Sequence, residues 1–174
     1  ASGTYYLVTS ILRPSGVKGH GVAVLTSNDL ETWKGPYSIF EIEPDFWAQG
    51  SVWAPEMHRY QGRYYLFATM NSRDKLSDEP WPNWPAKTKR GTQVLVADSP
   101  LGPFEPFHNR AHLDPNLMTL DGTLWIEDGV PYMIYCHEWV QIKDGTIDAI
   151  RLTDDLADVT GEPTTLLKAS DAPW

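Results

Sequence analysis

The sequence predicts an all-β fold built from repeated units, and two signals that recur in step along the chain lead to this prediction. A strand start of the form Gly-x-Tyr-Tyr-Leu begins at Gly3 and at Gly62, and a looser copy begins at Gly129. Each copy is followed by a polar turn that ends in leucine, at residues 27–30, 98–101 and 153–156. Repeats of this size, made of several short strands, are typical of β-propeller blades.

The repeats divide the chain into about three blades of one continuous domain, at residues 1–48, 49–118 and 119–174. The first unit lacks its beginning. Closed propellers usually need about four to eight blades, so three units represent part of a ring. Because an open segment exposes strand edges and apolar faces, we expect further blades or a second copy of the chain to cover its ends.

Alternating, β-branched and aromatic segments predict the individual strands in chain order. These segments are Tyr5–Leu12, Val22–Thr26, Trp33–Ile42, Val52–Tyr60, Arg63–Met70, Thr92–Ala97, Thr123–Glu127, Pro131–His137 and Thr146–Leu152. Residues 13–21 are predicted to form a loop rich in Pro, Gly and Ser.

A second, longer loop is predicted at Asn71–Gly91, because its three prolines are not tolerated in strand interiors. This segment also holds Trp81 and Trp84. Two alternatives stay open for these tryptophans. They line a substrate cleft, or they pack on the blade from which the loop comes.

Composition and charge favour a globular protein with a neutral partner. Hydrophobic residues make up 41% of the chain, and no apolar run approaches the roughly 20 residues needed to cross a bilayer. The formal charge is −9, which argues against nucleic acid or an anionic membrane as partner. Eight tryptophans and eight tyrosines suit the apolar faces and hydroxyl edges of sugars, although most such rings belong to protein cores.

The search for reactive groups leads to carboxylates. The five histidines lack the paired spacing of a metal site, and neither a nucleophile motif nor a phosphate-binding loop is visible. Cys136 lies in an apolar run and is expected to be a buried thiol. Asp121 stands out because it lies at a strand entrance with apolar residues on both sides; the alternative is an ordinary turn aspartate before glycine.

Several motifs, in order along nearly the whole chain, resemble glycoside hydrolase family 43. They are Trp53-Ala54-Pro55-Glu56, residues 60–66, residues 99–104, residues 120–125 and Asp128-Gly129. The resemblance implies a five-bladed propeller that hydrolyses arabinofuranosyl or xylosyl linkages of plant polysaccharides with inversion, using three carboxylates around a central pocket. It implies no required cofactor. The family often holds calcium near the propeller axis, but we find no ligand set for it in this sequence.

The resemblance also assigns roles to single residues. Asp121 matches the aspartate that raises the pKa of the general acid and orients it, and Trp53 matches a residue on the pocket side of the second blade. Glu56 is expected to be a structural acid that holds the turn of that blade. His137 follows at the end of the next strand, where a substrate-binding role and a purely structural role both stay open.

Two departures from the family pattern concern catalysis itself. The family's general base precedes the first aromatic strand, where only residues 1–4 stand here, and its general acid lies in a fourth blade. We therefore expect this chain to lack both. Alternatives to a hydrolase are a catalytically silent carbohydrate-binding segment and a structural fragment. Sugar specificity and the cellular compartment stay open, with a secreted or periplasmic location favoured.

Overall fold

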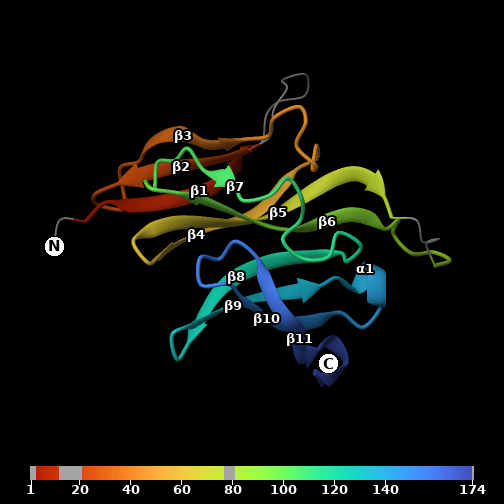
Figure 1. Cartoon of the computed structure of the whole chain (residues 1–174). Helices are drawn as coiled ribbons and strands as arrows, with labels where there is room; N and C mark the ends of the chain where they lie inside the picture. The colour runs from red at the N-terminus through yellow and green to blue at the C-terminus, as the bar shows by residue number, and fades with distance from the viewer. Residues whose placement is uncertain (1–2, 12–20, 77–80, 174) are drawn as a thin grey trace.

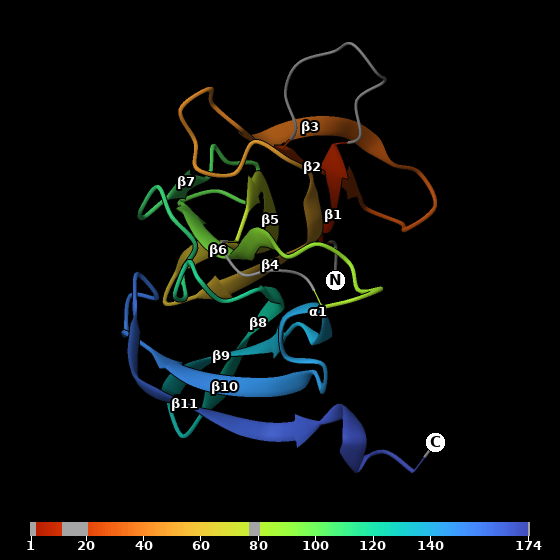
Figure 2. The same cartoon turned by 90° about the vertical axis from the view of Figure 1, so that its right-hand side faces the viewer.

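The computed structural model describes residues 3–11, 21–76 and 81–173, which form three antiparallel sheets (Figures 1 and 2). The first sheet contains β1 (Tyr5–Ile11), β2 (Gly21–Ser27) and β3 (Lys34–Glu41). The second contains β4 (Val52–Tyr60), β5 (Arg63–Lys75), β6 (Thr88–Ala97) and β7 (Glu105–Pro106). The third contains β8 (Thr119–Glu127), β9 (Val130–His137), β10 (Thr146–Leu152) and β11 (Val159–Lys168). The expected all-β class is confirmed.

Helical structure in the described ranges is limited to two short elements. They are α1 (Trp139–Ile142) and the 3₁₀ turn Ala169–Asp171. Neither is long and apolar enough to cross a membrane.

The middle sheet is buried on both faces, and this joins the three sheets into one body. On β5, Leu66, Ala68 and Met70 pack into a core shared with the first sheet. Tyr65 and Phe67, which alternate with them, pack into a core shared with the third sheet. Successive side chains of a strand point to opposite faces. The near-continuous apolar sequence of β5 therefore serves two cores, as in a strand covered on both sides.

Each sheet is a simple meander in which neighbours along the chain are hydrogen-bonded. The first strands of the two four-stranded sheets, β4 and β8, face the preceding sheet: β4 contacts β1, and β8 contacts β4, β5 and β6. In Figure 2 the three sheets accordingly follow one another in chain order.

The repeated Gly-x-Tyr-Tyr motif and its looser copy mark the start of the second strand in each four-stranded sheet. Gly62 and Gly129 occupy the turns before β5 and β9. The turn before β5 has positive φ at Gln61 (46°) and Gly62 (84°), and Asp128 and Gly129 repeat this at 50° and 79°. Two consecutive positive φ values are typical of tight hairpin turns. The motif thus marks a hairpin turn and the strand that follows it.

One predicted loop is shorter in the structure, and one long strand was not predicted. The ladder between β5 and β6 continues through Asn71↔Arg90 to Lys75↔Thr88, so the predicted loop at Asn71–Gly91 shrinks to residues 76–87, of which 77–80 lie outside the described residues. Strand β11 was missed because it holds Gly161 and Pro163. It lies at the edge of its sheet, where a residue without an N–H is tolerated. The loop predicted at 13–21 lies almost entirely outside the described residues.

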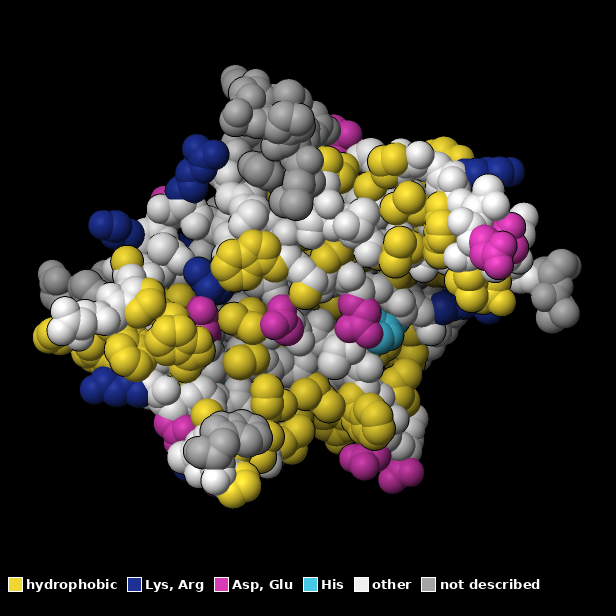
Figure 3. Space-filling model, turned by 180° about the vertical axis from the view of Figure 1, so that it is seen from behind, with side chains coloured by type: hydrophobic (Ala, Val, Ile, Leu, Met, Phe, Trp, Pro, Cys, Tyr) yellow, Lys and Arg dark blue, Asp and Glu magenta, His cyan; other side chains and the backbone are white. Residues whose placement is uncertain are grey.

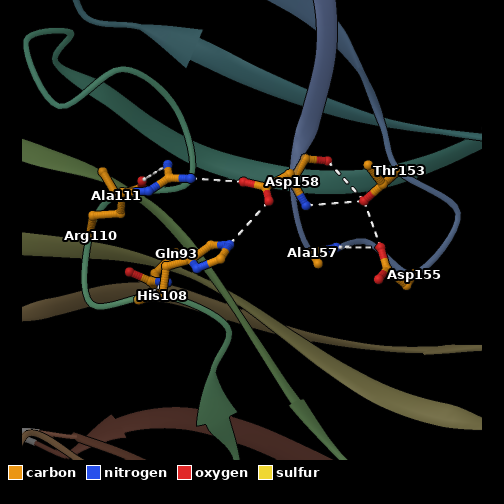
Figure 4. A network of polar contacts seen from close by, with 8 residues as sticks. All are labelled: Gln93, His108, Arg110, Ala111, Thr153, Asp155, Ala157 and Asp158. Atoms are coloured by element: carbon orange, nitrogen blue, oxygen red, sulfur yellow. Dashed lines mark hydrogen bonds and ion pairs between the residues drawn. The ribbon is translucent and has the colours of Figure 1, made fainter.

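A polar network ties the segment after β7 to the turn between β10 and β11 (Figure 4). Asp158 accepts from Arg110 Nη2 at 2.8 Å and lies 3.1 Å from His108 Nε2. Burial acts to raise the pKa of Asp158, but these two partners together hold it below its ordinary value. Within the turn, Thr153 donates to Asp155 and accepts from the Asp158 backbone N–H.

Next to this network, His112 is buried without a hydrogen-bond partner for Nε2 among the described residues. Burial lowers the pKa of His112 from 6.5 to about 4, although the charge of Asp158 opposes the change. The imidazole is therefore neutral in the folded protein at neutral pH.

We predict that His112 makes the protein less stable as pH falls from about 6.5 towards 4. The unfolded chain takes up this proton first, so the free energy of unfolding should drop by about 2 kcal/mol between pH 7 and pH 5. His112→Gln should flatten this dependence in urea unfolding, whereas the control His108→Gln, at a half-exposed position, should keep it. An unchanged slope in the His112 variant would refute the assignment.

Candidate active site

The candidate site begins at two irregularities in the first strands of neighbouring sheets. The pairing of β4 with β5 shifts between Trp53 and Glu56, and Ala54 has φ of 41°. The pairing of β8 with β9 shifts between Leu120 and Thr123, and Asp121 has φ of 52°. Such bulges bend a strand and re-aim its side chains, and they are common next to active sites.

Two threonines of the middle sheet hold the bulge of β8 in place. Thr69 and Thr92 are paired across β5 and β6 and are fully buried. The Asp121 N–H donates to Thr69 Oγ1 at 2.8 Å, and the Gly122 N–H donates to Thr92 Oγ1 at 3.1 Å. Hydroxyls of one sheet thus satisfy the backbone donors that the bulge of the next sheet frees from its ladder.

Asp121 therefore lies inside a strand and not in an ordinary turn. Its exposed side chain accepts a long hydrogen bond from Thr69 Oγ1 at 3.4 Å. Aspartate tolerates the left-handed backbone conformation better than most residues do, which fits it to this position.

Beside Asp121 the structure places a pair that we did not predict as part of a site, Arg90 and Glu138. Arg90 Nη1 donates to Glu138 Oε1 at 2.8 Å, and both side chains are largely buried. The guanidinium lies over the ring of Trp53, 4.7 Å from its centroid, and Trp53 itself is 42% exposed. The pair thus connects the second sheet, through Arg90 and Trp53, to the end of β9 in the third.

The charges of this cluster act on one another. Burial raises the pKa of Glu138; Arg90 opposes this, and the negative charge of Asp121 adds to it. Burial also raises the pKa of the Cys136 thiol, and the charges of Asp121, Glu138 and Asp148 raise it further. Cys136, which is half-buried and not fully buried as expected, is thus kept protonated and is no nucleophile at neutral pH.

His137 is held in a local network. Its Nε2 lies 2.8 Å from Gln141 Oε1, and the same oxygen accepts the Met118 N–H at 2.7 Å. Gln141 Nε2 donates to the Asn116 carbonyl at 2.7 Å. Helix α1 therefore braces the start of β8, and His137 takes part in this brace.

Trp84 contacts helix α1 of the neighbouring sheet, and Trp81 lies beside Trp84. Trp84 Nε1 donates to the Val140 carbonyl at 3.1 Å, and its ring meets that of Trp139 at 5.1 Å. Trp81 lies edge-on to Trp84 and close to the ammonium groups of Lys87 and Lys143. The loop thus bridges the second sheet and α1, directly after Glu138.

Glu56 lies within β4, beyond its bulge, and not at a turn. Its Oε1 is 3.0 Å from His58 Nε2, and Thr123 Oγ1 of β8 lies 3.4 Å from the same nitrogen. Burial lowers the pKa of His58 although Glu56 opposes it. This group links β4 to β8 away from Arg90.

The opposite side of the molecule from Figure 1 carries several acidic side chains across its middle, among hydrophobic ones (Figure 3). Among the described residues, no group of three or more His, Cys, Asp and Glu side chains could hold a metal ion. The described side chains of the site are carboxylates, an arginine and an aromatic ring.

A model of the glycosyl hydrolases family 43 matches residues 1–174, the whole chain. The chain belongs to glycosyl hydrolase family 43. The confirmed membership also agrees with the three sheets, because solved members of the family are β-propellers.

Three relatives illustrate the similarity. A solved endo-arabinase from Bacteroides thetaiotaomicron VPI-5482 is 40% identical with a TM-score of 0.80, over 98% of this chain and 54% of that one. An α-L-arabinofuranosidase from Clostridium thermocellum ATCC 27405 is 19% identical with a TM-score of 0.63, over 95% and 53%, and supports the fold alone. Xylosidase/arabinosidase 43A of Humicola insolens is 26% identical over 141 residues, 77% of this chain and 32% of that protein. The family 43 chain thus spans about half of each of these two solved relatives and a third of the Humicola enzyme.

We predict that Gly122→Ala loosens the site. A Cβ at position 122 would lie 2.5 Å from Thr92 Cγ2 and 2.7 Å from its Oγ1, so the bulge or the threonine must move. Overpacking of this kind costs about 1–3 kcal/mol in the free energy of unfolding, measurable by urea denaturation. Gly3→Ala, with open space around it, serves as control. The double variant Gly122→Ala/Thr92→Ala should lose less free energy of unfolding than the two single variants lose together. Strictly additive losses would contradict the contact between the two positions.

Proposed function

We propose that this chain is part of a glycosidase that hydrolyses arabinofuranosyl or xylosyl linkages of plant polysaccharides by inverting acid/base catalysis. Membership of family 43 supports the reaction class. The similarity to a protein described as an endo-arabinase, at 40% identity, supports an arabinose-containing substrate.

The observation that carries the proposal is the setting of Asp121. Two buried threonines hold its bulge in place. Burial raises the pKa of the neighbouring Glu138, Arg90 opposes this, and the negative charge of Asp121 adds to the rise. A carboxylate that raises the pKa of its neighbours is what a pKa modulator requires. Trp53, with Arg90 behind its ring, supplies a half-exposed aromatic surface for a sugar.

In an inverting glycosidase, a protonated carboxyl donates to the leaving oxygen while a carboxylate roughly 6.5–9.5 Å away activates water on the other face of the sugar. In the proposed mechanism Asp121 keeps the general acid protonated near neutral pH and orients it. The prediction that the general base and general acid lie outside this chain stays a prediction. Trp53, Trp81, Trp84 and His137 are proposed to contact or border the substrate, and Glu56 to support β4.

The alternative is a carbohydrate-binding segment without catalysis. The exposed ring of Trp53 favours sugar contact in either case. The two functions differ in what they need from Asp121, because a negative charge next to the general acid matters only for turnover.

We predict that Asp121→Asn lowers turnover by about 100-fold or more in the complete protein and leaves sugar affinity nearly unchanged. Turnover is followed by release of reducing sugar from arabinan and xylan, and affinity by calorimetry with the oligosaccharides. Asp128→Asn is the matched control, because Asp128 has nearly the same backbone conformation, with φ of 50°, in a hairpin turn. Binding without hydrolysis in the unaltered protein would select the alternative, and neither activity would reject both.

We also propose that further protein covers the third sheet. Trp125 and Leu166 are 53% and 55% exposed, and both line a hollow of about 520 Å³ on one face of this sheet, between β8 and β11. Large exposed apolar patches favour association. The 174-residue chain by itself should therefore scatter light as an assembly heavier than 19.7 kDa. A monodisperse monomer would contradict this proposal.

A further inference from the structure

Three of the five buried side-chain atoms without a hydrogen-bond partner in the described ranges belong to one cluster. They are Arg90 Nε, Glu138 Oε2 and Thr119 Oγ1. Thr119 belongs with the pair because it lies opposite His137 in the β8–β9 register and within reach of Gly91, next to Arg90. Buried polar groups are nearly always satisfied, so such a concentration of free ones points to a polar partner that completes them.

The unused groups include donors and acceptors. Arg90 uses Nη1 on Glu138 and Nη2 on Thr88 Oγ1, at 2.8 and 3.2 Å, and its Nε–H remains free. Glu138 Oε2 is a free acceptor. A hydroxyl group both accepts and donates, so it can take the arginine hydrogen and give its own to the carboxylate. A neutral sugar presents several such hydroxyls, and Trp53 beside Arg90 offers the ring surface.

Direct proton donation to a leaving group fits Glu138 less well. Arg90 donates to its Oε1 at 2.8 Å, and this contact favours the ionised carboxylate, which accepts a hydrogen bond but has no proton to give. Its backbone N–H is fixed on the Met118 carbonyl at 2.8 Å, so the residue is held from both ends. A carboxylate held in this way is suited to binding and positioning.

We propose that Arg90 and Glu138 form a hydroxyl-binding subsite for the sugar substrate, which rests on the proposed function. Arg90 donates to a sugar hydroxyl, and Glu138 accepts from the same group and holds the guanidinium over the ring of Trp53. Thr119 lies at the edge of the subsite.

The test uses the complete protein with 4-nitrophenyl α-L-arabinofuranoside and β-D-xyloside, and with the 2-, 3- and 5-deoxy forms of the arabinoside. Arg90→Lys keeps the positive charge next to Glu138 but removes Nε–H and the guanidinium over the Trp53 ring. Glu138→Gln keeps the size of the side chain. Each should lower kcat/KM on the better parent sugar by about 10- to 100-fold, the effect expected for a charged hydrogen bond.

The matched control is Arg110→Lys. Arg110 also pairs with a carboxylate at 2.8 Å, in the Asp158 network, and takes no part in the site. Its kinetics should equal those of the unaltered protein. Thermal unfolding of all variants separates a loss of the subsite from a loss of the fold.

The deciding comparison is between variants and deoxy sugars. Removing the hydroxyl that the subsite binds should lower kcat/KM of the unaltered protein by about 10- to 100-fold. In the Arg90→Lys variant, which has already lost this contact, the same removal should lower kcat/KM by less than about threefold. If every deoxy sugar lowers kcat/KM by the same factor in the unaltered protein and in the Arg90→Lys variant, the subsite is refuted. Arg90 would then have a structural role or would bind a bridging water. If the unaltered protein neither hydrolyses nor binds any of these sugars, the proposed function itself fails, and the subsite with it.

Discussion

The site depends on one contact between sheets, the grip of Thr69 and Thr92 on the backbone of Asp121 and Gly122. Strand β8 gives up regular pairing with β9 at this point, and a bulge without other partners would leave buried N–H groups unsatisfied. The threonine hydroxyls of the middle sheet supply those partners. The same middle sheet shares a core with each neighbour. The packing of the sheets against one another therefore also fixes the position of the Asp121 carboxylate.

Much of the fold could be predicted from local sequence patterns. The alternating and aromatic segments located most strands, since side-chain burial on a sheet repeats every two residues and leaves a record in the sequence. Strand β11 escaped because an edge strand tolerates the Gly161 and Pro163 that exclude a residue from a central one. The polar ends of β5 and β6 escaped because their ladder is held by backbone pairing, which leaves no apolar signature.

The candidate site was predictable in part. Asp121 and Trp53 stand in motifs of adjacent residues, which a sequence displays directly. Arg90 and Glu138 were missed because they are 48 residues apart and become partners only when the second and third sheets meet. A weak signal existed in Glu138, a charged residue directly after the apolar strand Val130–His137. Its meaning depends on a cation that only the fold brings to it.

The bridge from Trp84 to α1 has a consequence for how the protein could change over time. The segment that carries Trp84 is a surface connection, the kind of region in which evolution and engineers exchange loops freely. Here the Trp84 indole N–H donates to the carbonyl of Val140, which lies two residues after Glu138 in the chain. The loop therefore helps to hold Glu138 in place. Replacing this loop with the loop of a relative would therefore also change the position of the Glu138 carboxylate.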